Sequence, residues 1–468
     1  MSIAWRPFLL LSFATVGLAA CAVGRVPGAS DDAPSGRIPR IALSPAPAQP
    51  LPPQTEPENT ATTAGLRLDD LVAEAMIHNP MLQAEYSRYL GQREQIAQAR
   101  SLPDPMMKLK LMGVQRDAMK RDLEVMLSQM FPWFGKLRLM GEMADAESRA
   151  AKAQYQTALL DVMRDIKENY YKLEFEHAAW RLRSEEKNLL QQILYSLSAA
   201  YAGGQTGRQP LLKTQTELAR VESELVTFPA KIRSIEAELN RLTGAPPGRP
   251  MPPPGELPRD VVRVPQDDLI RMASEHRPEL ERLRAMIEKA QAQIRLAKKD
   301  YFPDITLGVI YQTNVDRQEM VPEEDDMWSL ELGFNIPIPN ARRRAQIRQA
   351  HLAEQEFTER TEAVLLDIEA ALRTVEIDLN NLYDQISLYE NNLLPLADET
   401  LAISRQEYRA GKGSFLDVLD AERMLLNVRL EYLRLLRDYR LNLVRLERAL
   451  GAEVIFESAL PAEPSNTQ

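Results

Sequence analysis

The sequence predicts a mainly α-helical protein with a small β part, built from two copies of one structural half. Three observations lead to this: long segments carry apolar residues at helical spacing, short segments alternate apolar and polar residues, and a set of short motifs occurs twice in the same order. The two copies span about residues 69–244 and 267–451. A repeat of about 200 residues is far longer than the period of a solenoid, so it indicates duplication of a whole structural half.

The repeated motifs keep nearly constant spacing. The offset between the copies grows from 198 to 207 residues, and the added residues fall mainly in the loop between two predicted strands. The matching pairs are His78-Asn79-Pro80 with His276-Arg277-Pro278, Leu102-Pro103-Asp104 with Phe302-Pro303-Asp304, Phe131-Pro132 with Ile336-Pro337, residues 201–204 with 408–411, and residues 239–244 with 446–451. We therefore expect a first repeat at 66–244 and a second at 266–454, joined by a proline-rich linker at 245–265.

Composition limits the classes of function. The chain has 44% hydrophobic, 26% charged and only 6% aromatic residues, which is typical of a helix-rich protein. A net charge of -10 argues against nucleic acid as a partner. No run of 18 apolar residues is present, so we expect no membrane-spanning helix. We find no glycine-rich phosphate loop and expect no cofactor.

The beginning of the chain has the features of a bacterial lipoprotein signal. Arg6 precedes the apolar run 8–16, and the segment LAAC follows at 18–21. We interpret residues 1–20 as a signal peptide and Cys21, the only cysteine, as the acylated first residue of the mature protein. The alternative is ordinary cleavage beside an incidental cysteine. Ala22 stands where an aspartate would resemble an inner-membrane retention signal, so the outer membrane is favoured.

Two terminal segments lie outside the repeats. Residues 21–65 contain nine prolines with Ser, Thr and Ala between them, which indicates an extended, lipid-anchored tether rather than a folded domain. We expect the residues after Gly451, including the tail at 455–468, to be irregular.

The expected helices have lengths that add up. They span about residues 69–101, 136–202 and 209–243 in the first half, and 267–300, 341–410 and 414–450 in the second. In each half the two short helices together nearly match the long one, so they could stack end to end beside it. At 1.5 Å per residue the long helix spans roughly 100 Å, which suits a tube crossing a compartment. On the last helix two apolar stripes lie side by side, as in a helix wedged between two neighbours; an ordinary bundle core is the alternative.

Four short segments alternate apolar and polar residues, at about 107–111, 122–128, 305–312 and 328–336. This pattern fits strands of an outer-membrane barrel, and it equally fits a half-buried soluble sheet. The signal peptide and the predicted acylation favour the barrel. Membrane barrels begin at about eight strands, so four strands would have to be completed by further copies of the chain.

The segment YRAGKGSFLDVLDA at 408–421, the duplicated halves and the Pro-Asp entries into the strands carry a resemblance to a known family. From residue 66 to 454 the chain resembles a TolC-type outer-membrane efflux protein. The resemblance implies a homotrimer with a 12-stranded β-barrel in the lipid of the outer membrane and a 12-helix barrel in the periplasm. It also implies an exit duct in a tripartite pump, whose partners are a periplasmic adaptor protein and an inner-membrane transporter.

The resemblance further implies a gate at the helix tips. Asp417 and Asp420 match an acidic pair that lines the constriction, where rings of carboxylates attract cations. The alternative is that both are solvated helix-start residues that complement the helix dipole. Tyr408 matches a tyrosine that hydrogen-bonds between hairpins in the closed state, but its usual acidic partner falls at Pro210, and Lys213 stands at the repeat position of Asp420.

Glycines mark both hairpin tips. We expect them to supply the backbone freedom of the turns, and the resemblance implies that the adaptor docks there. They are Gly203, Gly204 and Gly207 in the first hairpin, and Gly411 and Gly413 in the second.

Substrate and rival functions rest on weaker patterns. Eight of the 18 methionines fall between 106 and 143, which suggests a path for soft metal ions; the alternative is that methionine fills gaps at strand-to-helix junctions. Glu174 and His177 have a Glu-x-x-His spacing seen in di-iron enzymes, but the second half does not repeat it, so we expect no enzyme. A lipid-anchored periplasmic helical adaptor is the other alternative, although that class has β-rich domains flanking a single hairpin.

Overall fold

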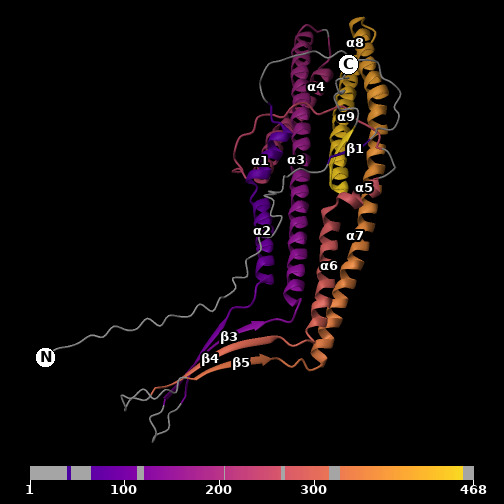
Figure 1. Ribbon diagram of the computed structural model, residues 1–468. Coiled ribbons are helices and arrows are strands. Elements are labelled where there is room, and N and C mark those ends of the chain that lie inside the picture. Colours follow the sequence, from indigo (N-terminus) through magenta and orange to yellow (C-terminus); the bar gives the residue numbers. More distant parts are fainter. Residues whose placement is uncertain are drawn as a thin grey trace, which may run out of the picture. The chain divides into compact units, whose positions relative to one another are not determined.

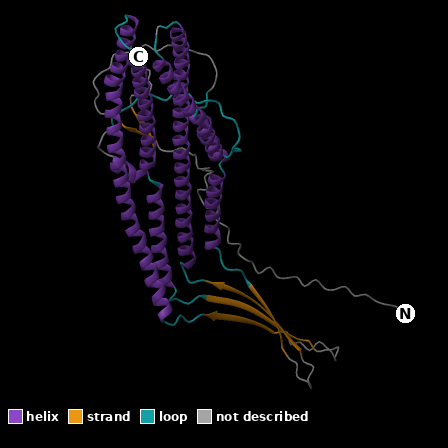
Figure 2. Cartoon of the chain, turned by 180° about the vertical axis from the view of Figure 1, so that it is seen from behind, coloured by secondary structure: helices purple, strands orange, loops and turns teal. Residues whose placement is uncertain are grey.

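The computed structural model describes residues 40–43, 65–112, 121–204, 206–264, 269–315 and 327–456. The predicted signal peptide, Cys21 and most of the tether lie outside these residues, as does most of the predicted tail. Helices make up most of the described chain, and four strands form one sheet (Figures 1 and 2). No helix of the described residues is both long and apolar enough to cross a membrane.

The longest helix, α3 (Lys136–Ala202), organises the helical part. It packs against α2 (Pro80–Arg100) and α4 (Arg208–Thr243) from the first half, and against α6 (Pro278–Lys299) and α9 (Phe415–Leu450) from the second. Figure 1 shows α6 and α9 following one another beside α7 (Ala341–Leu388). Both α6 and α9 contact α7, so two short helices do run along one long helix as the sequence predicts.

The expected helices at 69–101 and 267–300 are each broken, which corrects our prediction. The first divides into α1 (Leu68–His78) and α2, and the second into α5 (Leu269–His276) and α6. Proline disfavours the helical conformation of the residue before it, and Asn79 and Arg277 accordingly have extended ψ angles of 117° and 116°. The stacked helices are therefore 21 and 36 residues long in the first half, against 67 in α3.

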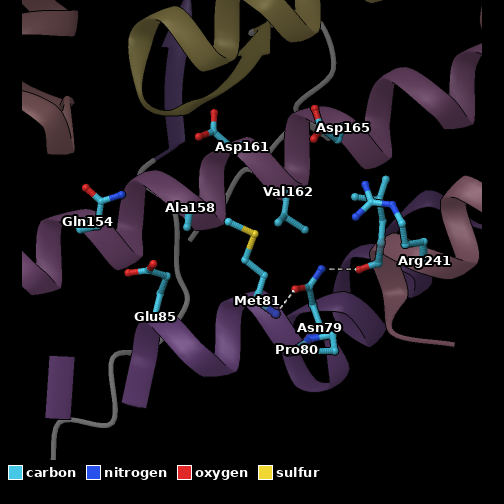
Figure 3. A pocket seen from close by; sticks show the side chains of 11 residues that line it. Asn79, Pro80, Met81, Glu85, Gln154, Ala158, Asp161, Val162, Asp165 and Arg241 are labelled. Carbon is cyan, nitrogen blue, oxygen red and sulfur yellow. Dashed lines mark hydrogen bonds between the residues drawn. The ribbon is translucent and has the colours of Figure 1, made fainter. Parts of the chain in front are cut away.

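The first break meets the C-terminal end of α4. The Asn79 Nδ2 donates to the Leu242 carbonyl at 2.7 Å, and its Oδ1 accepts the Met81 N–H at 2.9 Å (Figure 3). Gly244 ends α4 with a φ of +78°, and a Cβ there would lie 2.3 Å from the His78 carbonyl oxygen. The motifs HNP and LNRLTG, which the second repeat matches with HRP and LERALG, thus occur together because they form one helix-to-helix junction.

The second break repeats this junction with different chemistry. The Arg277 Nε donates to the Ala449 carbonyl at 2.7 Å, and Ala449 stands at the repeat position of Leu242. Gly451 ends α9 with a φ of +76°, and a Cβ there would lie 2.9 Å from the His276 carbonyl oxygen. Arg448 ties the junction to α3, since its Nε donates to Asp161 at 2.7 Å. The duplication is therefore visible in three dimensions.

The expected helix at 341–410 is continuous but irregular. It consists of α7, a π-helical turn at Tyr389–Leu393 and α8 (Leu394–Arg409). Pro395 lacks an N–H, so the backbone ahead of it cannot keep the regular hydrogen-bond ladder, and an extra residue is accommodated in the turn. Both α7 and α8 contact α9, whose other side faces α3. The prediction that α9 lies between two neighbours is confirmed.

The sheet combines strands from both halves in the order β2-β3-β4-β5, with every neighbouring pair antiparallel. The strands are β2 (Met106–Met112), β3 (Arg121–Phe131), β4 (Ile305–Val315) and β5 (Met327–Phe334). The central pair, β3 with β4, joins the first repeat to the second. The two repeats therefore form one sheet rather than two.

A second, two-stranded sheet was not predicted. β1 (Arg40–Leu43), within the predicted tether, pairs in parallel with β6 (Glu453–Phe456) directly after α9. The expectation of an irregular chain after Gly451 is therefore wrong for these four residues. Two short strands at opposite ends of the sequence carry no local signal of their pairing.

Candidate functional site

One face of the four-stranded sheet is apolar and exposed. Register places Leu109, Val125, Tyr311 and Trp328 in one row, and Met107, Leu127, Val309 and Leu330 in the next. Leu330 is 88% exposed and Trp328 68% exposed. An ordered row of large apolar side chains facing outward across four strands is the arrangement of a surface that contacts hydrocarbon.

The other face of the sheet is polar. Lys110 and Glu124 pair across β2 and β3 with 3.8 Å between nitrogen and oxygen. Gln312 pairs with Glu124 from β4. Glu331 and Ser329 continue this face on β5. On β4 this face has no charge and consists mainly of small and polar residues, with Ile310 as an exception. The alternation of an apolar and a more polar face confirms the two-residue pattern that the sequence predicts.

A buried lysine connects the sheet to the helices. The Lys136 Nζ, on the first residue of α3, lies 2.9 Å from Asp304 Oδ1 and 3.1 Å from Asp300 Oδ1. Asp304 Oδ1 also accepts the Trp133 N–H at 2.8 Å, and the Trp133 ring stacks on Phe302 with 5.3 Å between centroids. Two carboxylates thus compensate the burial of the lysine charge, and the Trp133 N–H holds the Asp304 carboxylate in place. The contact fixes the direction in which α3 leaves the sheet.

At the opposite end of α3 the hairpin tips contain the predicted glycines. Gly204 and Gly411 have φ angles of +72° and +69°, where glycine is favoured. Gly203 and Gly207 have φ angles of -79° and -77°, which any residue adopts, so backbone freedom does not explain them. A Cβ at Gly413 would lie 3.0 Å from the Glu407 Cβ, so close packing explains this glycine.

The two predicted gate carboxylates have different partners. Asp417 forms a capping box with Ser414: its Oδ2 accepts the Ser414 N–H at 2.9 Å, and the Ser414 hydroxyl accepts the Leu416 N–H at 3.1 Å. Asp417 thus has the helix-start role that we considered as the alternative. Tyr408 places its ring edge-on to Phe415, with 5.8 Å between centroids.

Asp420 belongs to a ladder of charges between the two hairpins. Its Oδ1 lies 3.5 Å from the Lys213 Nζ of α4. One turn further along, the Arg423 Nε lies 3.2 Å from Glu217 Oε1. A hydrogen bond from Arg220 lowers the pKa of Glu217, so this carboxylate stays charged. Sequence reasoning noted that Lys213 and Asp420 share a repeat position, but it missed the contact and the second pair.

A pocket of about 420 Å³ lies at the first helix junction (Figure 3). Met81 and Val162 give it apolar walls, and Asp161, Asp165 and Arg241 give it charged ones. Within the described residues, no group of three or more His, Cys, Asp or Glu side chains could hold a metal ion. We therefore regard this pocket as a feature of the junction rather than as a metal site.

Glu174, from the Glu-x-x-His motif, is buried in the helical part. It is 3% exposed, and its Oε2 has no hydrogen-bond partner. Burial raises its pKa to about 7, against the opposing effects of a hydrogen bond with Tyr170 and the charge of Arg440. The Tyr170 hydroxyl donates to the Leu66 carbonyl at 3.0 Å. Burial also lowers the pKa of His177. Glu174 therefore acts as a neutral packing group at low pH.

Replacing Glu174 with glutamine should make the protein more stable above pH 7. In the unfolded chain the carboxyl ionises near its ordinary pKa of 4.5, whereas the folded one keeps its proton up to about pH 7. Stability from this group is complete below pH 4.5 and falls as pH rises to 7, by about 3 kcal/mol. The Glu174→Gln variant should not show this decrease in stability with rising pH. Denaturant midpoints at pH 5 and pH 8 measure it, with the exposed Glu185→Gln as control; equal pH dependence in wild type and Glu174→Gln would contradict the assignment.

The helical layer and the sheet each have two open edges, and the elements at corresponding edges are neighbours in the sequence. Around α3 the order runs from α2 and α4, through α6 and α9, to α7 and α8. In the sheet the edges are β2, which follows α2, and β5, which precedes α7. Large apolar side chains of the last edge are exposed; they are Leu352, Leu366, Ile377, Leu388, Leu396 and Ile403. The edge with α7, α8 and β5 in one copy can pack against the edge with α2, α4 and β2 in a second copy. Repetition of this contact closes a ring of copies.

One face of the four-stranded sheet is apolar and exposed, and helices of about 100 Å continue from the sheet. Together these features define the class of outer-membrane channel subunits. The family described as "Outer membrane efflux protein" matches residues 71–245 and 269–452. The chain belongs to this family. It is therefore an outer-membrane efflux protein and not an enzyme.

Individual relatives are distant but cover most of the chain. The cobalt-zinc-cadmium resistance protein CzcC of Cupriavidus metallidurans is 23% identical over 363 residues, 76% of this chain and 83% of the relative. The probable outer membrane lipoprotein SilC of Salmonella typhimurium is 24% identical, over 73% of this chain and 74% of that protein. The crystal structure of CusC has the same fold, with a TM-score of 0.72 and 20% identity, over 88% of this chain and 100% of that chain.

Proposed function

We propose that the protein is the exit duct of a tripartite efflux pump, through which substrates pass passively from the periplasm to the exterior. The sheet is the observation that carries the proposal: its apolar face is exposed and its edges β2 and β5 are open. In hydrocarbon, each unpaired backbone N–H or C=O at an edge costs several kcal/mol. Further copies must therefore pair with both edges. Three copies supply 12 strands, which suits an outer-membrane barrel.

The helical edges support the same homotrimer. The exposed apolar residues of α7 and α8 face away from α9, and in a ring they would pack on α2 and α4 of the next copy. A ring of three chains would continue the barrel as a helical tube into the periplasm. A lipid anchor at Cys21 would add acyl chains to the outer membrane without a protein span.

An acidic gate at the helix tips would control the duct. In a trimer Asp417 and Asp420 would form two stacked rings of carboxylates, with Tyr408 nearby on the same hairpin. Lys213 supports a closed state, because its contact with Asp420 links the two hairpins of one chain. Opening would separate this pair and expose the Asp420 charge to the pore.

Partners would assemble at the end of the helical part that the hairpin tips form. The tip turns, with Gly203, Gly204 and Gly207 in one and Gly411 and Gly413 in the other, would dock a periplasmic adaptor. An inner-membrane transporter would supply the energy. The names of the relatives CzcC and CusC refer to cobalt, zinc and cadmium and to cations, which favours metal cations over organic compounds as substrates.

Single-channel recording tests the duct and its gate. The wild-type protein should conduct in a planar bilayer with a low, cation-selective conductance, and a trivalent hexammine cation should block it. Asp417→Asn with Asp420→Asn should weaken this block by roughly tenfold, since each ring loses its charge. Lys213→Gln should strengthen the block, because it frees the Asp420 carboxylate.

The exposed Glu399→Gln on α8 is the matched control and should leave the block unchanged. Absence of conductance in the wild-type protein would contradict the duct. Normal conductance with unchanged block in the double variant would remove Asp417 and Asp420 from the pore lining.

A further inference from the structure

An exposed basic segment follows the apolar face of the sheet. Apolar side chains occupy every second position along β5 and directly after it, and each of them is at least 62% exposed; they are Trp328, Leu330, Leu332, Phe334, Ile336 and Ile338. The helix α7 begins three residues after Ile338, and its first two turns contain Arg342, Arg343, Arg344 and Arg348. Positive charge therefore begins where the apolar row ends.

The length of the apolar row matches the thickness of a membrane. Trp328 and Ile338 are 10 residues apart. An extended chain with about 3.4 Å per residue and a tilt of about 40° spans roughly 26 Å of membrane over this length, and the apolar band of an outer-membrane barrel is about 25 Å tall. With the sheet in the outer membrane, as proposed above, the start of α7 would lie at the level of the periplasmic lipid headgroups.

Helix stability does not explain these arginines. Cations at a helix N-terminus oppose the helix dipole, and the first turn of α7 contains no acidic residue. The first acidic residue of the helix is Glu354, roughly 20 Å from its start. Within the described residues, no ion pair involves Arg342, Arg344 or Arg348. This concentration of positive charge contrasts with the net charge of -10 of the whole chain.

The first repeat shows that the fold does not require an arginine cluster at this place. The repeat position of Arg343 is Arg138, but Leu137 and Leu139 stand on either side of it. Leu139 is 1% exposed, so this helix start is partly packed into the core. In the second repeat Arg342 and Arg344 replace the two leucines, and both are exposed. The arginines therefore need an explanation other than the start of a long helix.

One arginine is held beside the end of the apolar row. The Arg343 Nη1 donates to the Ile338 carbonyl at 2.5 Å, and its guanidinium lies 5.8 Å from the centre of the Tyr301 ring. Basic and aromatic side chains at the end of an apolar band are typical of the interface between hydrocarbon and headgroups. Arg342 and Arg344 stand about 100° to either side of Arg343, and their long side chains can reach along the helix surface toward the same layer.

We propose that Arg342, Arg343 and Arg344 form a docking surface for anionic phospholipid headgroups of the periplasmic leaflet. The proposal rests on the proposed function, because that function places the sheet in the outer membrane. Guanidinium groups bind phosphate oxygens in a bidentate manner, and anionic lipids attract basic segments beside a membrane. A zwitterionic headgroup carries its own ammonium group and competes with the arginines for its phosphate. Bound anionic lipid would fix the height of the duct in the membrane.

Native mass spectrometry of the full-length protein tests the docking surface. The protein is released from nanodiscs that contain equal amounts of phosphatidylglycerol and phosphatidylethanolamine, and retained lipids are counted. We expect retained phosphatidylglycerol to exceed phosphatidylethanolamine roughly fivefold. The variant Arg342→Gln/Arg343→Gln/Arg344→Gln should retain the two lipids about equally, whereas replacement of all three by lysine should keep most of the preference, because the charge remains.

A matched control removes the same charge elsewhere. Arg284→Gln/Arg360→Gln/Arg409→Gln changes three exposed arginines that lie at least about 20 Å along their helices from the sheet, and it should keep the wild-type preference. Equal retention of both lipids by the wild type, or an unchanged preference in the first glutamine variant, would overturn the proposal. Loss of the trimer in that variant, without lipid preference in the wild type, would instead place the arginines between copies.

Potassium conductance in a planar bilayer separates the two levels of the account. A wild-type protein that conducts but shows no preference for phosphatidylglycerol refutes the docking surface alone. Absence of conductance in the wild type refutes the duct.

Discussion

Leu330→Arg should prevent stable assembly in the outer membrane, whereas Ser329→Arg should not. Leu330 is 88% exposed on the apolar face of β5, and Ser329 is the adjacent residue on the polar face. Arginine on the lipid face costs about 2–4 kcal/mol near the middle of the bilayer, and a homotrimer bears this cost in every copy. At Ser329 the same side chain would face the interior, where charge is tolerated.

The two variants contain the same new residue one position apart, so each controls for the other. Outer-membrane fractions are compared by the amount of heat-modifiable oligomer on unboiled gels. Leu330→Arg should reduce this amount by at least tenfold, and Ser329→Arg by less than twofold. Equal loss in both variants would mean that the two faces of β5 do not differ in environment.

Gly244→Ala should destabilise the helical part more strongly than any other glycine-to-alanine change in the first repeat. The position has a φ of +78°, and the added Cβ would lie 2.3 Å from the His78 carbonyl oxygen. Left-handed strain costs about 1 kcal/mol, and the backbone clash must also be relieved by moving α1 away from α4. We expect a loss of at least about 2 kcal/mol in the free energy of unfolding.

Gly91→Ala is the matched control, because nothing lies within 4 Å of a Cβ there. Inside α2, alanine should stabilise by about 0.5–1 kcal/mol. Denaturation followed by circular dichroism measures both variants. A stability of Gly244→Ala equal to that of the wild type would contradict the close contact between the helix ends.

The long helices and the sheet could be predicted because their signals are local and repeated. The 67 residues of α3 match the predicted span without change, since apolar spacing continues to a glycine turn. Alternation in the strands correctly identified which residues share a face. The breaks fall directly before Pro80 and Pro278, but the apolar pattern continues across both prolines, so the pattern alone predicts unbroken helices.

Other features depend on partners far away in the sequence. The pairing of β1 with β6 joins residues that carry no local sign of each other. The contact of Lys136 with Asp304 requires the order of the strands, which follows only from the fold. At the tips, the motif identified Asp417 and Asp420, yet their different partners, Ser414 and Lys213, depend on helix ends and helix packing.

The native mass of the detergent-extracted, unboiled protein tests the central claim most directly. Native mass spectrometry should give three times the mass of the mature chain, because the open edges at β2 and β5 must pair with neighbouring copies. A monomer that stays in solution without detergent would contradict the account. The apolar face of the sheet would then need a partner other than lipid, and the protein could not be a duct.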